Sequence, residues 1–273
     1  MKTVLIRTLS GVVYISLILG SILLGKIVFG IVMLFFVALC LIEFQILVRN
    51  IDIVINRLTL LLTGLLIYGT CTIGLMQIAY LRYLVFVIPL ILIPFIVEVF
   101  RKDNHPGLNL SISLSGLIYI VLPFVVLNAL AFPDMFKGHS DKQLAIGFFL
   151  IIWTNDTFAY LSGMFFGKHK FFERISPKKT WEGTFGGLLF GILAGYFLSV
   201  FFKDHSTIQW IGFSVVIIIF GTFGDLFESM LKRTVGIKDS GNIMPGHGGI
   251  LDRFDSILMA APVAFVYMFF VLN

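Results

Sequence analysis

Long apolar runs are the feature of this sequence that most constrains its fold. An apolar helix of about 20 residues spans the hydrocarbon core of a bilayer, and only helices or closed barrels satisfy every backbone group there. The runs are continuous and do not alternate, which favours helices over a barrel. We therefore expect an all-α, polytopic integral membrane protein with about nine transmembrane helices, at approximately 8–25, 27–48, 58–78, 82–100, 110–132, 143–165, 183–202, 208–231 and 251–271.

The positive charges indicate how these spans are oriented. If the connections alternate across nine spans, 15 of the 20 lysines and arginines fall on one side of the membrane and five on the other. The positive-inside rule makes the richer side cytoplasmic. We therefore expect the N-terminus and both long polar connections, 166–182 and 232–250, in the cytoplasm. The net charge of +5 then reflects topology and attraction to anionic headgroups, and we expect no nucleic-acid partner.

Acidic residues gather where the last two apolar runs meet the connection 232–250. The eighth run ends in "GTFGDLFESMLKR" and the ninth begins with "GGILDRFDS". Within each helix, two acids and a serine follow one another at i, i+3 and i+4, so they share one face. These residues are Asp225, Glu228 and Ser229 in the eighth run, and Asp252, Asp255 and Ser256 in the ninth.

Two interpretations of these acids remain open. If the connection folds the two helix ends together, four carboxylates converge at the cytoplasmic edge of the bilayer and repel one another unless a cation lies among them. Ligands that are all oxygen favour Mg²⁺. The alternative is a purely structural network in which Lys232, Arg233 and Arg253 pair with the acids.

A further acid, Asp156, lies near the middle of the sixth run beside Asn155. An acid at such a depth is costly and is usually paired or functional. It is a candidate metal ligand, nucleotide contact or orienting group, and the alternative is a buried helix-packing hydrogen bond.

The segment "RISPKKTWEG" resembles a helix start. Ser176 is a suitable cap and Pro177 suits the first helical position, which would place Lys178 and Lys179 in the first turn. Cations are unfavourable there unless an anion such as phosphate binds at the same place. The pair therefore predicts a phosphate contact, although two solvated lysines that serve only topology are the alternative.

Glycines dominate the stretch "MPGHGGI". Backbone amides without side-chain hindrance, here at Gly248 and Gly249, are suited to approach phosphates. His247 is placed either to donate to a phosphate oxygen or to cap the next helix.

Two segments resemble the phosphatidate cytidylyltransferases, also called CDP-diacylglycerol synthases. They are "SMLKRTVGIKDSGNIMPGHGGILDRFD", from Ser229, and "NDTFAYLSGMFFGKHKFFERISPKKTWEGTFGG", from Asn155. The resemblance covers the C-terminal half from about residue 150, and one position usually filled by Ile, Leu or Phe holds Met244. It implies one integral membrane domain over 1–273, with N-terminal helices of unassigned role at 1–140 and a catalytic half at 143–271.

The resemblance implies a homodimeric enzyme of a bacterial inner membrane that converts CTP and phosphatidic acid into CDP-diacylglycerol and pyrophosphate with Mg²⁺. It assigns Asp225 and Asp252 to a metal centre that can also hold K⁺; Glu228 and Asp255 join them as candidates. Further signature positions, expected to act in catalysis or substrate binding, are Lys232, Arg233, Lys238, Asp239, His247, Gly248, Gly249 and Arg253. The rival functions are another CTP-using lipid transferase, such as a polyprenol kinase, and a transporter.

Overall fold

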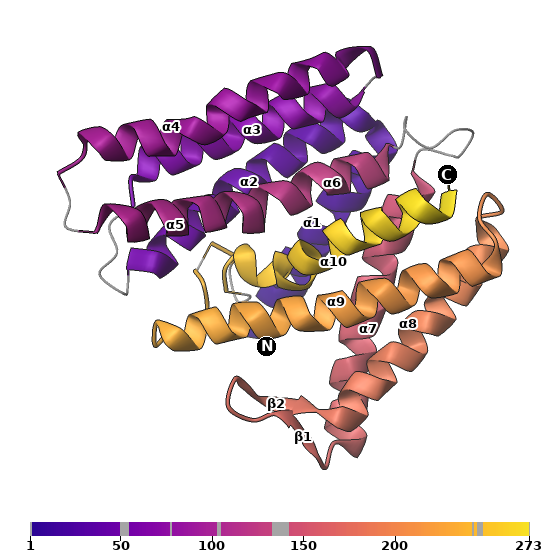
Figure 1. Cartoon of the computed structure of the whole chain (residues 1–273). Coiled ribbons are helices and arrows are strands. Elements are labelled where there is room, and N and C mark those ends of the chain that lie inside the picture. The colour runs from indigo at the N-terminus through magenta and orange to yellow at the C-terminus, as the bar shows by residue number, and fades with distance from the viewer. Residues whose placement is uncertain are drawn as a thin grey trace.

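The computed structural model describes residues 2–49, 55–76, 78–102, 105–132, 142–241, 243–244 and 248–272 and is almost entirely helical. Figure 1 shows long helices in a bundle, with a small hairpin at one corner. The elements of the N-terminal part are α1 (Lys2–Leu24), α2 (Lys26–Arg49), α3 (Arg57–Met76), the 3₁₀ helix η1 (Ile78–Phe86), α4 (Val87–Phe100), α5 (Pro106–Gly116), the π-helical turn η2 (Leu117–Val121) and α6 (Leu122–Ala131). The C-terminal part contains α7 (Gln143–Phe166), β1 (Lys170–Phe172), β2 (Ser176–Thr180), α8 (Trp181–Phe201), α9 (Thr207–Thr234) and α10 (Leu251–Leu272).

Eight helical segments in the described part of the chain are long and apolar enough to cross a membrane. A shorter apolar helix, Thr8–Leu24, precedes them. The expectation of an all-α polytopic membrane protein is confirmed, while the count of nine is approximate. The predicted fourth and fifth spans are composite: η1 continues into α4, and α5, η2 and α6 follow one another without a break.

Close helix packing in the C-terminal part depends on glycines of α8. Four of them, spaced four residues apart, are buried along one face of the helix: Gly183, Gly187, Gly191 and Gly195. Small residues at this spacing let helix backbones approach closely inside a membrane. The stripe packs α8 against α7 and α9, and Figure 1 shows α8 beside α7, which crosses α9 steeply.

The segment before α8 corrects one prediction. We expected Ser176 to cap the helix and Lys178 and Lys179 to lie in its first turn, but β2 pairs there with β1 in an antiparallel hairpin. The helix begins at Trp181, and the cap is Thr180, whose Oγ1 accepts a hydrogen bond from the Gly183 amide. The two lysines therefore project from a strand, so a helix N-terminus is not the reason for their position.

The carboxylate of Glu182 helps to fix this hairpin. It accepts hydrogen bonds from the backbone amides of Lys168 and His169 and lies 2.6 Å from Nδ1 of His169. These contacts hold the chain before β1 against the first turn of α8. They explain why the polar segment folds back as a strand and does not continue the helix.

The packing of α8 makes a testable prediction about stability. A methyl group at Gly195 would meet the Ser214 hydroxyl and would lie 2.9 Å from the Trp210 carbonyl oxygen, whereas a methyl group at Gly69 of α3 has nothing within 4 Å. Overpacking of this kind costs about 1–3 kcal/mol, while alanine favours a helix over glycine by about 1 kcal/mol. Gly195→Ala should lower the thermal unfolding midpoint of the detergent-solubilised protein, and Gly69→Ala should leave it unchanged or raise it. Equal midpoints for the two variants would contradict this packing.

Candidate functional site

A pocket of about 480 Å³ opens between α7, β2, α8, α9 and the start of α10. Its polar lining comes from all of these elements and includes Asn155, Asp156, Lys178, Lys179, Thr180, Thr184, Thr222, Asp225 and Ser256. Four residues predicted from separate motifs, Asn155, Asp156, Lys178 and Lys179, thus meet Asp225 in one cavity. This gathering makes the pocket the candidate functional site.

Opposite charges face each other inside the pocket. Nζ of Lys179 lies 2.5 Å from Oδ2 of Asp225, so β2 and α9 are joined by an ion pair. The Ser229 hydroxyl donates to Oδ1 of the same aspartate at 3.3 Å. On α7, the Asn155 amide donates to Oδ1 of Asp156 at 3.2 Å. Lys178 lines the same cavity, so the pocket offers two lysines to an anionic ligand.

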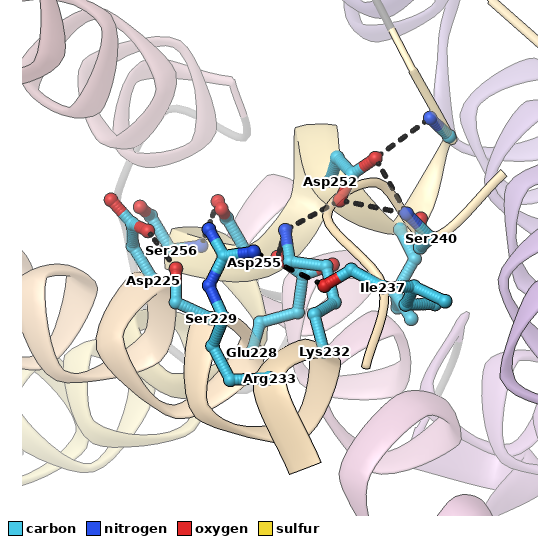
Figure 2. Close-up of polar contacts among 12 residues, drawn as sticks. Asp225, Glu228, Ser229, Lys232, Arg233, Ile237, Ser240, Asp252, Asp255 and Ser256 are labelled. Atoms are coloured by element: carbon cyan, nitrogen blue, oxygen red, sulfur yellow. Dashed lines mark hydrogen bonds and ion pairs between the residues drawn. The ribbon is translucent and has the colours of Figure 1, made fainter. Parts of the chain in front are cut away.

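A second cluster lies beside the pocket, where α9 meets α10 (Figure 2). Nζ of Lys232 donates to Oε2 of Glu228 at 2.7 Å and to Oδ1 of Asp252 at 2.6 Å. Oδ2 of Asp252 also accepts the backbone amides of Ser240 at 3.0 Å and Gly249 at 2.8 Å. Glu228 and Lys232 are one helical turn apart on α9, so they share one face of the helix. On that face the lysine also reaches the carboxylate of Asp252 on α10.

The four carboxylates expected to converge lie near the junction of α9 and α10 (Figure 2), but they have different partners. Lys232 occupies the space between Glu228 and Asp252, as in the structural alternative, while Asp225 faces the pocket with Lys179. Asp255 accepts a hydrogen bond from the Ser256 amide at 2.6 Å. In the described residues, no group of three His, Cys, Asp or Glu side chains is arranged to hold a metal ion. Two of the acids, Glu228 and Asp252, have Lys232 as their cation.

The oxygen atoms that line the pocket are ligands of the kind that Mg²⁺ prefers. The pocket lining offers oxygen ligands from Asp156, Thr222, Asp225 and Ser256. Outside the lining, in the neighbouring cluster, the buried Oε1 of Glu228 has no hydrogen-bond partner. Mg²⁺ is commonly bound by one or two carboxylates together with substrate phosphates and water, rather than by a cage made of protein alone. The pocket therefore fits a Mg²⁺ whose coordination is completed by a substrate.

The other predicted residues lie around the connection between α9 and α10. Arg233 is exposed and donates to the Ile237 carbonyl at 3.2 Å, and Lys238 and Asp239 are exposed. Gly248 has a positive φ of 84°, and its carbonyl accepts the amide of Met244. Arg253 is exposed in the first turn of α10. His247 lies outside the described residues, so its predicted role stays a prediction.

One residue of this region was missed by the sequence analysis. Glu43 of α2 is fully buried and accepts hydrogen bonds from the Ile250 and Leu251 amides at the start of α10. The available signal was a lone acid in the predicted span 27–48, because an acid inside a span is usually paired or functional.

The fold and the pocket together define a polytopic helical membrane protein in which lysines and carboxylates meet in a polar cavity. The chain matches the model of the Cytidylyltransferase family over residues 5–271 and belongs to this family. It is therefore a nucleotidyltransferase.

Two relatives illustrate the similarity. The chain is 44% identical over 177 residues to the phosphatidate cytidylyltransferase of Staphylococcus epidermidis, an alignment that covers 56% of this chain and 68% of the relative. It is 42% identical over 173 residues to the phosphatidate cytidylyltransferase of Staphylococcus aureus, which covers 55% of this chain and 66% of the relative.

The lysine between α9 and α10 leads to a second prediction. Lys232→Met would leave the carboxylates of Glu228 and Asp252 buried beside each other without their cation, and removal of one partner from a buried ion pair costs about 3–5 kcal/mol. We expect a marked fall in the thermal midpoint of the detergent-solubilised protein. Arg233→Met removes a neighbouring but exposed cation and should change the midpoint little. A Lys232→Met protein as stable as the Arg233→Met control would show that the network contributes little.

Proposed function

We propose that this protein is a magnesium-dependent phosphatidate cytidylyltransferase of phospholipid biosynthesis, which converts CTP and phosphatidic acid into CDP-diacylglycerol and pyrophosphate. The observation that carries the proposal is the meeting of Lys178, Lys179 and Asp225 in one pocket of a membrane-embedded family member. The names of the Staphylococcus relatives supply the lipid substrate.

The proposed reaction needs little acid–base chemistry from the protein. A phosphate monoester is largely dianionic near pH 7, so a phosphatidate oxygen is already a nucleophile. It forms a bond to the α-phosphorus of CTP while the bond from that phosphorus to the bridging oxygen breaks, and pyrophosphate leaves with its electron pair. Catalysis of phosphoryl-type transfer consists mainly of positioning and charge neutralisation.

The pocket residues have corresponding roles. Lys178 and Lys179 bind phosphate oxygens of CTP, since lysines are effective point charges for phosphate. Asn155 and Asp156 of α7 line the same pocket and orient the bound nucleotide. Asp225 is the carboxylate that would hold Mg²⁺, and the bound ion would supply positive charge against the substrate phosphates. A K⁺ ion beside it, and metal ligation by Asp252, Glu228 and Asp255, stay predictions.

Lys232 and Asp252 act differently in this proposal. They form an ion pair with each other, which fixes the start of α10. Ser256, four residues further along α10, then lies in the pocket wall. Arg233, Lys238 and Arg253 are exposed cations near this start. They attract the anionic substrates to the membrane edge, an effect that weakens with salt.

Access to the pocket also supports a lipid substrate. Phosphatidic acid can approach laterally because its acyl chains never have to leave the bilayer, while CTP arrives from water. The charge distribution in the sequence supports an inner-membrane protein with a cytoplasmic N-terminus and active site. A homodimer is part of the same proposal.

An assay with labelled CTP, phosphatidic acid and Mg²⁺ in detergent micelles tests the function. We expect a labelled CDP-lipid and release of pyrophosphate, and Asp225→Asn should lower kcat at least about 100-fold, in the range found when a charge-stabilising group is removed from an active site. Glu173→Gln, which changes an exposed acid of the hairpin, is the control. A phosphorylated alcohol as product would instead identify a polyprenol kinase, and the absence of any CTP-dependent product would sink the proposal.

The two lysines of β2 should act mainly on the nucleotide. Because Lys178 and Lys179 line the pocket, Lys178→Ala and Lys179→Ala should each raise the KM for CTP about tenfold, the equivalent of roughly one charge-assisted hydrogen bond of 1.5 kcal/mol. Lys170→Ala, on the partner strand, is the matched control. Initial rates over a range of CTP concentrations measure the effect. An unchanged KM for CTP in both pocket variants would mean that these lysines serve only membrane topology.

A further inference from the structure

A carboxylate from the N-terminal half of the chain lies at the entrance to α10. Glu43, two turns before the end of α2, has a fully buried side chain. Its Oε1 accepts the Ile250 amide at 2.9 Å, and its Oε2 accepts the Leu251 amide at 2.8 Å. The Ser240 hydroxyl donates to the same Oε2 at 3.0 Å. One side chain of α2 thereby binds the middle of the connection between α9 and α10, at Ser240, and its junction with α10.

Glycines on the connection leave room for this carboxylate. A methyl group on Gly241 would lie 2.5 Å from Oε1 of Glu43, and one on Gly249 would meet Oε2. The carboxylate therefore occupies the space that a side chain at either position would need. The connection and Glu43 fit each other in shape as well as in hydrogen bonding.

The contacts of Glu43 are interlocked with those of Asp252. The amide of Gly249 donates to Asp252, while the two amides that follow it donate to Glu43. Ser240 joins the two acids, because its amide donates to Asp252 and its hydroxyl to Glu43. The position of Asp252 against Lys232 thus depends on the position of Glu43.

We propose that Glu43 is a positioning residue for the transferase reaction: it fixes the first turn of α10 and the glycine-bearing connection so that the cluster beside the pocket keeps its geometry. This inference rests on the function proposed above. An acid in an apolar span is costly, and the backbone amides at a helix start need acceptors that lipid cannot supply. Glu43 meets this need from a helix that contributes no lining residue to the pocket.

The isosteric change Glu43→Gln gives the sharpest test. Glutamine has nearly the same volume but only one acceptor oxygen, so at least one of the amides of Ile250 and Leu251 loses its partner and faces an N–H group. We expect kcat to fall at least tenfold with a smaller change in the KM for CTP, because the nucleotide-binding lysines lie elsewhere. The matched control is Glu98→Gln on α4, where the acid accepts from Asn109 and Arg101; its kcat should stay within twofold of the wild type.

Limited trypsin cleavage gives a readout that does not depend on activity. Lys238 is exposed on the connection, so a loosened connection should be cut there at least three times faster in Glu43→Gln than in the wild type. Cleavage in the hairpin at Lys170, which Glu43 does not contact, should keep its rate. A role in packing volume alone predicts no change in either measurement, because glutamine fills the same space.

The proposal requires both a lower kcat and faster trypsin cleavage at Lys238 in Glu43→Gln. A kcat within twofold of the wild type, or an unchanged rate of cleavage at Lys238, would overturn it. If Glu43→Gln does not yield folded protein, Ser240→Ala decides, because it removes only the hydroxyl contact with Glu43: a kcat lowered at least threefold supports the role and a wild-type value refutes it. Should the wild type itself form no CDP-lipid, the proposed function fails, and the cleavage rates still test the positioning of the connection.

Discussion

A lysine held between two buried carboxylates is the interaction on which the candidate site depends. Lys232 contacts Glu228 on its own helix and Asp252 on the next, and it ties the end of α9 to the start of α10. Without a cation, the two acids would repel each other in surroundings of low dielectric constant. With it, the ends of the two helices can lie together, and Ser256 of α10 reaches the same pocket as Asp225 of α9.

The charges near this junction fall into two groups with different tasks. In the inner group, Lys232 is enclosed by its acids and is not available to a ligand. In the pocket, Lys179 pairs with Asp225 on one side only, and Lys178 lines the same cavity. A phosphate that enters would compete with Asp225 for Lys179 and release the carboxylate toward a metal ion. A pocket that exchanges partners in this way suits a substrate that brings both phosphate and Mg²⁺.

The sequence predicted the spans and the shared faces of α9 and α10 because both follow from local periodicity. It also identified Asn155, Asp156 and the lysine pair as candidate site residues, but their meeting with Asp225 in one pocket comes from the fold. It did not predict the strand at Lys178 and Lys179, because a serine and a proline before two lysines suit a helix start, and only the contacts of Thr180 and Glu182 decide otherwise. For the four acids the sequence left a metal ion and a lysine–carboxylate network open as alternatives, because spacing along a helix does not show which cation lies between two helices; the structure places Lys232 there.

Glu43 shows why the N-terminal helices matter to a site that the motifs place in the other half. The first amides of α10 have no acceptor within the helix, and the positive end of its dipole favours an anion. In a soluble enzyme, water or a capping side chain nearby in sequence can accept these hydrogen bonds. Here the helix starts at Leu251, directly after Ile250, and both residues are buried. The acceptor therefore has to come from another helix, and α2 provides it. A local reading of the motif could not find this contact, because the two partners are joined only by the fold.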